Sequence, residues 1–392
     1  MMENNSKKRI LILSTAYYPF VGGAEVAIKE ITDRLGSSFE FDLITAKLRN
    51  DLPKFEKIGN VNVYRIGTGN QTLDKLLLPF RGFLLAKRLH RRREYFCMWG
   101  MMATFASGAG YIFNIYRFLT FRKKVPIVLT LQEGDSEGHL KFRWLGLIAL
   151  SWKLALRSTD VLTAISNFLL NRARKNGYTG ESFLVPNGVD IDVFGKEIEE
   201  SVKSEMMKIL NKKDNEIFLV TTGRLTHKNA TDDIISSLPK LSSNVSLIVI
   251  GRGDEGPRLQ KQASDLGVSD RVKFLGFIPY NEIPKYFSVC DIFIRPSRSE
   301  GFGNSFIEAM AAKLPVIATP VGGIVDFIND KETGVFCSPN NPQSIVKAVN
   351  LILEDSLLRQ QITQNAYLRV NERYGWDKVT GQMAEVFNLL AK

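Results

Sequence analysis

Short runs of β-branched and other apolar residues alternate with amphipathic stretches along most of this 392-residue chain. This alternation narrows the choice of fold more than any other feature, because strand, helix and strand in turn build parallel α/β sheets. The strands that we expect in the first half span residues 9–14, 41–45, 61–64, 95–99, 127–131, 161–164 and 183–185. Those of the second half span residues 217–222, 246–250, 272–275, 292–295, 316–318 and 334–336.

The alternation pauses near Pro186, Asn187 and Gly188, where a polar segment, residues 195–216, leads into the second series of strands. We place the interdomain linker there. The sequence therefore predicts an N-terminal domain over residues 1–190 and a C-terminal domain from residue 191 onward. Two similar α/β domains imply a cleft between them, and such clefts commonly bind ligands.

Composition is that of a soluble globular protein, with 44% hydrophobic and 24% charged residues. Cys97, Cys290 and Cys337 are far apart, so neither a disulfide framework nor a zinc site is indicated, and the cytoplasm is the expected compartment. Residues 98–116 carry no charge and lie between basic runs, as in a membrane span. Their glycines and polar residues, and their division into a strand over 95–99 and a helix over 104–120, favour a soluble segment instead.

The net charge of +11 is spread unevenly, because basic residues gather with aromatic ones between Arg81 and Arg93 and in residues 117–124 and 141–157. Such segments suit an anionic membrane surface or a nucleic acid, and the alternative is a solvated basic face. The sequence has no nucleic-acid-binding motif. We therefore expect no nucleic-acid partner, and we consider a peripheral location on the inner face of the cell membrane, reached through the basic N-terminal domain.

A stretch from Arg295 to Gly323 combines two carboxylates, Glu300 and Glu308, with the turn Gly301-Phe302-Gly303. The turn opens an expected helix whose free N–H groups suit an anion, while carboxylates on either side suit sugar hydroxyls. An alternative interpretation is structural. Ser305 and Glu308 have the spacing of a helix capping box, and Glu300 is then a solvated loop acid.

Two further loops follow strands. The first expected strand of the second domain ends at Gly223, Arg224 and Lys228. Two cations beside a helix start form a plausible pyrophosphate clamp, although they could equally be surface cations. In the first domain the turn after residues 9–14 ends in Gly22-Gly23, whose amides could meet an acceptor or a phosphate, or form a plain strand-to-helix loop.

Residues 251–256, GRGDEG, match the glycine pattern of dinucleotide-binding loops. The strand that follows ends without the acidic residue that would bind ribose, and Pro257 interrupts the helix start. We therefore do not expect nicotinamide binding. His90, His139 and His227 form no spaced cluster, so we expect no metal site.

Several of these motifs occur together in the order of one known family. They are Gly22-Gly23, residues 185–190, residues 223–225 with Lys228, and residues 299–323 with their pair of glutamates eight positions apart. The chain resembles retaining glycosyltransferase family 4 (glycosyl transferases group 1), whose members have the GT-B fold of two Rossmann-like parallel-sheet domains facing a central cleft. In that family a final helix returns to the first domain. The resemblance thus implies a donor-binding domain over 191–373 and an acceptor-binding domain over 1–190, on which residues 374–392 pack.

The resemblance also implies roles for residues. Arg224 and Lys228 would hold the diphosphate of the donor, and Glu300 would bind hydroxyls of the transferred sugar and stabilise its developing positive charge. Glu308 would hold the ribose. The remaining donor contacts would come from Gly223, Ile278 in the nucleobase loop 277–279, and the amides of Gly301, Phe302 and Gly303.

One position departs from the family pattern. Many members carry a histidine after the strand that corresponds to residues 127–131, where this chain has Gln132 and, slightly later, Asp135. Either residue could replace the histidine in the acceptor cleft, together with Gly22 and Gly23. The family needs neither a cofactor nor a bound metal.

The function that this resemblance implies is retaining transfer of a hexose from a nucleotide-diphosphate sugar to an acceptor hydroxyl. The acceptor would be glycan or lipid-linked, such as a glycolipid or a cell-surface polysaccharide precursor. Two alternatives stay open. One is a nucleotide-sugar epimerase or hydrolase of the same fold, and the other is a non-catalytic nucleotide-sugar-binding protein.

Overall fold

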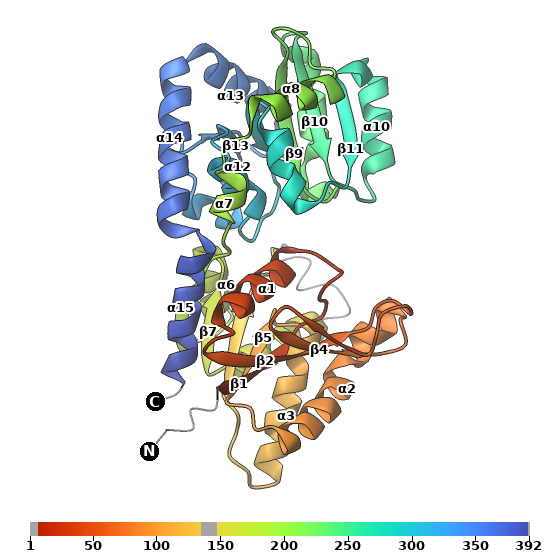
Figure 1. Cartoon of the computed structure of the whole chain (residues 1–392), viewed down its shortest axis with the longest axis vertical. Coiled ribbons are helices and arrows are strands. Elements are labelled where there is room, and N and C mark those ends of the chain that lie inside the picture. Colours follow the sequence, from red (N-terminus) through yellow and green to blue (C-terminus); the bar gives the residue numbers. More distant parts are fainter. Residues whose placement is uncertain (1–6, 135–146, 391–392) are drawn as a thin grey trace. The chain divides into compact units, whose positions relative to one another are not determined.

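The protein is described by a computed structural model that covers residues 7–134 and 147–390 (Figure 1). The chain forms two compact units, each with its own sheet and core. Unit 1 contains residues 1–187 and 376–392, and unit 2 contains residues 188–375. The expected boundary at residue 190 therefore lies three positions beyond the observed one, and the returning segment begins at Trp376 rather than Tyr374.

Unit 1 is built on an eight-stranded sheet, counted over the described residues, with the order β3-β4-β2-β1-β5-β6-β7-β8. Its strands are β1 (Lys8–Leu13), β2 (Phe39–Ala46), β3 (Phe55–Ile58), β4 (Val61–Ile66), β5 (Cys97–Met101), β6 (Ile127–Leu131), β7 (Val161–Ala164) and β8 (Glu181–Leu184). All neighbours pair in parallel except β3 with β4. The sequence analysis missed β3, because this short edge strand lacks the apolar run by which the others were recognised.

Helices cover both faces of this sheet. They are α1 (Gly23–Leu35), α2 (Gln71–Arg92), α3 (Gly108–Leu119), α5 (Leu147–Ser158), α6 (Asn167–Lys175) and α15 (Trp376–Leu389), with a 3-10 turn at Phe105–Ser107. α1 and α15 lie side by side on one face, and α2 and α3 lie together on the other (Figure 1). Residues 98–116 thus form β5, the turn and part of α3. Among the described helices, none is both long and apolar enough to cross a membrane.

The alternation of side chains along β1 explains this layering, because successive residues of a strand point to opposite faces. Ile10 and Ile12 belong to the core shared with α1 and α15. Leu13 faces the other way, where its side chain lies near Gly110 of α3. Both faces of the parallel sheet are therefore apolar, as burial between two helix layers requires.

Unit 2 is built on a six-stranded parallel sheet with the order β11-β10-β9-β12-β13-β14. Its strands are β9 (Ile217–Thr222), β10 (Val245–Ile250), β11 (Val272–Gly276), β12 (Ile292–Arg295), β13 (Val316–Ala318) and β14 (Val335–Phe336). Its α-helices are α7 (Ile191–Phe194), α8 (Glu200–Ile209), α9 (Thr231–Ser237), α10 (Gly256–Asp265), α11 (Ile283–Phe287), α12 (Asn304–Ala311), α13 (Pro342–Glu354) and α14 (Ser356–Arg373).

The polar segment 195–216, expected to be a linker, instead forms helix α8 and belongs to unit 2. Met206 and Leu210 are buried at a spacing of four residues, and α8 packs against α11. Charged residues on the outer face of α8 dominate its composition and hide this apolar stripe. The passage between the units lies at Asn187 and Gly188, where the sequence analysis noted the pause in the alternation.

The strand order in unit 2 reverses direction at β9, which makes the carboxyl end of this strand a switch point of the sheet. β9, the first strand, lies between β10 and β12, so the chain runs outward from β9 in one direction through β11 and then restarts on its other side at β12. The loops after β9 and β12 consequently diverge above the sheet. In open α/β sheets this crevice at the carboxyl ends of the strands is where ligands bind.

Helix α15 contributes to the core of unit 1, and a substitution of Phe387 tests how much that contribution stabilises the fold. Its ring is fully buried, with ring centroids 5.6 Å from Phe39 and 5.4 Å from Trp99. We expect Phe387→Ala to lower the free energy of unfolding of unit 1 by about 3–5 kcal/mol, because it leaves a cavity. Denaturant unfolding measures this change. Leu357→Ala, at an exposed position of α14, is the control, and an equal loss there would contradict the assignment.

Candidate active site

Three loops meet the carboxyl edge of the unit 2 sheet. One follows β9 and carries Arg224 and Lys228, one follows β12 and carries Glu300, and one follows β11 and contains residues 277–279. β11 and β12 are separated by β10 and β9, which sets them three strand spacings apart, or about 14 Å. An extended nucleotide sugar has a comparable length, so these loops suit its successive parts.

Arg295, the last residue of β12, joins these loops. Its side chain is 10% exposed, and its guanidinium donates to Asn229 Oδ1 at 2.8 Å, Ser305 Oγ at 2.8 Å and Glu300 Oε2 at 2.5 Å. Asn229 Nδ2 in turn donates to the carbonyl of Arg224 at 2.6 Å. One buried cation therefore connects the cation loop, the Glu300 loop and the first turn of α12.

Arg298 makes a second connection between the same loops. Its amide donates to the carbonyl of Lys228 at 2.7 Å, and its guanidinium donates to the carbonyl of His227 at 2.7 Å. The same guanidinium pairs with Asp232 and Asp233 at the start of α9. The backbone that carries Lys228 is thus fixed relative to the loop that carries Glu300.

The side chains of Arg224 and Lys228 remain available for a ligand. Arg224 is exposed and Lys228 is half-buried, and no carboxylate in the described part of the chain pairs with either. Buried cations usually acquire a partner, whereas these two side chains lie on the loop after β9, where, among the described residues, only the backbone is held by other side chains and amides. Such an arrangement suits a polyanionic ligand, for which an Arg and a Lys supply charge-assisted hydrogen bonds.

Glu300 is not the solvated acid that one interpretation of the sequence allowed. It is 9% exposed, and its Oε1 accepts from the amide of Gly301 at 3.0 Å while Oε2 accepts from Arg295. Its carbonyl accepts from the amide of Gly323 at 3.2 Å. A Cβ atom on Gly322 would lie 1.8 Å from the same carbonyl, so glycine is required there. The carboxylate is therefore oriented by fixed partners.

The turn after Glu300 is anchored from behind. Phe302 is 1% exposed, with ring centroids 5.0 Å from Phe327 and 5.6 Å from Tyr374. Its side chain cannot reach a ligand, so only the backbone of residues 301–303 can serve in binding. Gly303 has φ of 100° and precedes the first residue of α12, which explains why glycine occupies this position.

The capping-box interpretation of Ser305 and Glu308 is wrong. α12 begins at Asn304 after Gly303, without a side-chain cap, which places Ser305 and Glu308 inside the helix rather than at its cap positions. Ser305 instead accepts from Arg295. The carboxyl of Glu308 has no hydrogen-bond partner among the described residues, and burial raises its pKa to about 7, an effect that the charge of Arg295 partly opposes. Such a group is free to contact a ligand.

The loop after β11 presents an aromatic side chain. Phe277 is 64% exposed, Ile278 is half-buried, and Gly276 before them has φ of 72°. An exposed aromatic ring at the carboxyl end of a strand suits stacking against a planar base. The sequence analysis named Ile278 for this contact and gave no separate role to Phe277.

The glycines of residues 251–256, GRGDEG, which match the dinucleotide-binding pattern, allow two loops to pack closely together. A Cβ atom on Gly251 would lie 1.9 Å from the carbonyl oxygen of Gly223, and one on Gly253 would lie 2.2 Å from that of Leu225. The amide of Leu225 also donates to the carbonyl of Arg252 at 3.0 Å. These glycines therefore support the cation loop, which accounts for them without a dinucleotide. Pro257 stands in the first turn of α10, where proline is tolerated.

In unit 1 three of the predicted acceptor residues, Gly22, Gly23 and Gln132, follow strands at the carboxyl edge of the sheet. Gly22 precedes α1 and Gly23 opens it, and a Cβ atom on Gly22 would lie 2.7 Å from Glu25 Oε2. A carboxylate at this helix start disfavours a phosphate there. Gln132 and Asn187 exchange two amide hydrogen bonds, of 3.1 and 3.3 Å. Asp135 lies outside the described residues.

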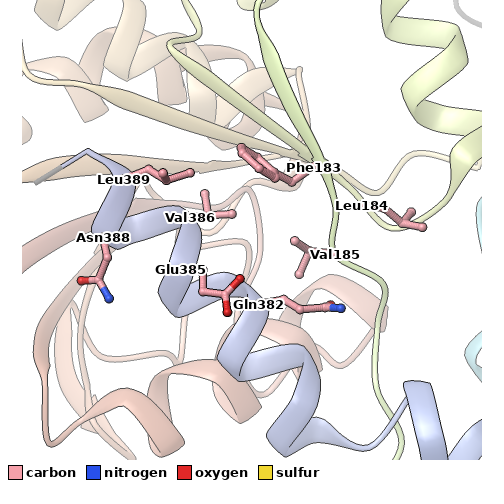
Figure 2. Close-up of a pocket in the computed structure, with 8 residues that line it drawn as sticks. All are labelled: Phe183, Leu184, Val185, Gln382, Glu385, Val386, Asn388 and Leu389. Carbon is pink, nitrogen blue, oxygen red and sulfur yellow. The ribbon is translucent and has the colours of Figure 1, made fainter. Parts of the chain in front are cut away.

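Two further observations limit the site. Within residues 7–134 and 147–390, no group of three His, Cys, Asp or Glu residues is arranged to hold a metal ion. A surface pocket of about 580 Å³ lies in unit 1, between β8 with the residue after it and α15, and it contains none of the predicted site residues (Figure 2). Phe183 and Val185 line one side of it and Val386 and Leu389 the other, a mainly apolar lining that offers little for sugar chemistry.

The two-unit architecture matches solved structures over nearly the whole chain. Sucrose-phosphate synthase of Thermosynechococcus elongatus superposes with a TM-score of 0.83 at 20% identity, covering 98% of this chain and 99% of that chain. The Anabaena protein HepE, in complex with UDP and glucose, superposes with a TM-score of 0.77 at 23% identity, covering 97% and 99%. The fold is therefore GT-B, as the motifs led us to expect.

The sequence comparisons define the family. The family described as Glycosyltransferase Family 4 matches residues 21–193, and the family described as Glycosyl transferases group 1 matches residues 202–369. An uncharacterized glycosyltransferase of Methanocaldococcus jannaschii is 26% identical over 391 residues, which are 97% of this chain and 98% of that protein. This chain belongs to the family 4 (group 1) glycosyltransferases.

Another similar protein is a GDP-mannose-dependent alpha-(1-6)-phosphatidylinositol monomannoside mannosyltransferase of Mycobacterium tuberculosis. It is 28% identical over 240 residues, which are 58% of this chain and 61% of that protein.

Sequence reasoning missed Arg295 and Asn229. Arg295 ends an apolar strand, FIR, and an arginine at the carboxyl end of a buried strand is a signal in itself, because such a charge needs partners. Its partners, however, are 5, 10 and 66 positions away in the chain. Periodicity could not connect them.

The pKa of Glu308 makes the stability of the fold depend on pH. The folded value of about 7 exceeds the ordinary 4.5, so the folded state keeps a proton that the unfolded state releases. Stability is therefore lost as pH rises from about 4.5 to 7, by up to about 3 kcal/mol. We expect Glu308→Gln to remove this loss in denaturant unfolding at several pH values. Exposed Glu354→Gln is the control, and a parallel dependence in wild type and Glu308→Gln would contradict the prediction.

The hydrogen bonds of Arg295 predict that a substitution at this position lowers turnover even when it keeps the positive charge. Arg295→Lys keeps a cation but cannot reach Asn229, Ser305 and Glu300 together. We expect glycosyl transfer to fall about a hundredfold, because small displacements of catalytic groups have such effects. Steady-state rates and thermal unfolding are measured together, with exposed Arg359→Lys as the control. If the rate falls only in proportion to the fraction of folded protein, Arg295 does not position the catalytic groups.

Proposed function

We propose that this glycosyltransferase moves a hexose from a nucleotide-diphosphate sugar to an acceptor hydroxyl, with retention of anomeric configuration. The single observation that carries the proposal is the fixed junction of two loops at the switch point of unit 2. Arg295 and Arg298 hold the loop of Arg224 and Lys228 against the loop of Glu300. A cation pair and an oriented carboxylate are therefore presented together.

The donor would lie along the sheet edge from β11 to β12. Its base would contact the loop of Phe277 and Ile278, and its ribose would meet Glu308. The diphosphate would lie between Arg224 and Lys228, close to the amide of Gly223. The sugar would meet Glu300 and the amides of residues 301–303. Because these groups all belong to loops and helix α12 of unit 2, the donor site does not depend on unit 1 for its assembly.

The reaction that we propose exchanges one bond to the anomeric carbon for another on the same face. The bond from that carbon to the leaving phosphate oxygen breaks, and the bond to the acceptor oxygen forms. The acceptor proton passes to the leaving phosphate oxygen. Arg224 and Lys228 stabilise the charge that develops on the leaving diphosphate, and Glu300 stabilises positive charge on the sugar.

The acceptor is proposed to be glycan or lipid-linked, and to bind unit 1 near Gly22, Gly23 and Gln132. The relatives support this class. The mycobacterial protein is named for transfer from GDP-mannose to a phosphatidylinositol mannoside, and a Rhizobium meliloti relative, 27% identical over 250 residues, is named as a lipopolysaccharide core mannosyltransferase. Both names describe sugar addition to lipid-bearing glycans.

A panel of nucleotide sugars, assayed for nucleotide release with and without glycolipid acceptors, tests the proposal. We expect release that depends on acceptor, and a product anomer that matches the donor when observed by NMR. Equal release without acceptor would indicate an epimerase or hydrolase. Nucleotide binding without any release would indicate a binding protein, and an inverted product would overturn retention.

The charge roles predict specific losses. We expect Lys228→Ala and Glu300→Ala each to lower turnover by about two to three powers of ten, because each removes a preorganised electrostatic group. Exposed Lys240→Ala, in the same unit, controls for loss of a positive charge. Near-normal transfer by Lys228→Ala protein would exclude this lysine from the diphosphate site.

A further inference from the structure

Helix α2 of unit 1 carries two apolar faces. One packs into the unit through Leu78, Gly82, Ala86 and Leu89. The other consists of five exposed side chains spaced three and four residues apart, with exposed fractions from 36% to 62%: Leu73, Leu76, Leu77, Phe80 and Leu84. Residues at this spacing share one side of a helix. A second apolar stripe is therefore present that the core does not use.

Helix α3 extends this apolar surface. It lies beside α2 (Figure 1). The ring centroids of Phe83 on α2 and Tyr116 on α3 are 5.7 Å apart. The C-terminal half of α3 and the residues after it expose four more large apolar side chains, with exposed fractions between 57% and 100%: Ile115, Phe118, Leu119 and Phe121. Apolar side chains gathered on adjacent elements mark an interaction surface rather than scattered exposure.

Positive charge surrounds these side chains. Arg88 and Arg91 follow Leu84 by four and seven residues and so continue the same face of α2, and Arg122 and Lys123 follow the apolar end of α3. The acidic residue within α2, Asp74, is buried and accepts from the amides of Thr68 and Gly69. α3 contains no acidic residue. The exposed surface of this helix pair is thus apolar and basic, without compensating carboxylates on either helix.

The phenol of Tyr116 reports this positive potential. A hydrogen bond with Lys87 lowers its pKa, and the charges of Lys87 and Arg122 act in the same direction. Lys87 also lies 4.0 Å from the centroid of the Tyr116 ring. The lowered pKa of Tyr116 therefore indicates that the surface between the exposed apolar residues of α2 and those of α3 is positively charged.

We propose that this α2–α3 surface, formed by the exposed apolar side chains of residues 73–84 and 115–121 and by Arg88, Arg91, Arg92, Arg122 and Lys123, docks on an anionic phospholipid bilayer. Leucine and phenylalanine side chains enter the boundary between headgroups and acyl chains. The arginines and lysine contact lipid phosphates and the negative surface.

The chemistry of the surface favours a bilayer over other polyanionic or apolar partners. A nucleic acid would use the cations but would leave the aliphatic side chains of Leu73, Leu76, Leu77 and Leu84 without partners. A second copy of this surface would cover them but would oppose like charges. A bilayer with anionic headgroups satisfies both groups at once. The inference does not rest on the proposed donor chemistry, because these residues lie in unit 1 and outside the loops of the site.

Vesicle flotation of the full chain tests the proposal. Two compositions are compared, phosphatidylcholine alone and phosphatidylcholine with about one third phosphatidylglycerol, at low and high salt. We expect the protein to float with the anionic vesicles and to remain below with the neutral ones. Higher salt should reduce the floating fraction, because it screens the contribution of the basic residues.

Paired variants then locate the surface. We expect Arg88→Glu with Arg122→Glu to weaken vesicle binding at least tenfold, since each basic residue near such a surface contributes roughly fivefold. We expect Phe80→Ser with Phe118→Ser, tested separately, also to weaken binding at least tenfold, because binding strength increases with the apolar area that enters the bilayer. Matched controls are Leu357→Ser with Leu368→Ser and Lys175→Glu with Lys240→Glu, which change exposed residues elsewhere. Thermal unfolding of every variant verifies that exposed substitutions leave the fold intact.

The remaining outcomes overturn the proposal. Binding that is equal for neutral and anionic vesicles, or that survives both α2–α3 variants, would show that this surface does not dock on anionic lipid. Preferential binding to DNA, lost in the arginine variant but kept in the phenylalanine variant, would assign the surface to a nucleic acid. A dimer in light scattering that disappears with Phe80→Ser and Phe118→Ser, without vesicle binding in the wild type, would assign it to a second copy.

Discussion

The proposed donor site of this glycosyltransferase depends on one buried guanidinium. Arg295 ends a strand in the middle of the unit 2 sheet, where an unpartnered charge would be costly. Its ion pair with Glu300 and its hydrogen bonds to Ser305 and Asn229 compensate that charge and, in doing so, set the positions of the carboxylate, the helix start and the cation loop. The energetic requirement to compensate a buried charge and the geometric requirement to arrange a site are met by the same contacts.

Much of the fold could be predicted from the sequence. Strands such as residues 127–131, 217–222 and 292–295 were located to the residue, because buried parallel strands are short, apolar and β-branched. Errors occurred where that signal is weak. The edge strand β3 has no buried face, and the stripe of α8 is hidden among charged residues. Local patterns also do not show that residues 376–392 belong to the same unit as residues 1–187.

The candidate site was predictable in its parts and not in its connections. Glycines, cations and carboxylates after strands indicated a ligand, and Glu300, Arg224 and Lys228 do lie on adjoining loops. The sequence could not show that Ser305 serves Arg295 rather than capping a helix, or that Phe302 faces the core. These features depend on pairings between residues up to 72 positions apart, such as Phe302 with Tyr374, which only the packed structure brings together.

The return of α15 to unit 1 has a consequence for the order in which the protein can be completed during synthesis. Residues 188–375 include everything that unit 2 needs, whereas the core of unit 1 lacks Trp376, Val379, Met383 and Phe387 until all of unit 2 has been made. Domains generally fold as they emerge. Unit 2 can therefore form first, while unit 1, although most of it is made earlier, waits for α15.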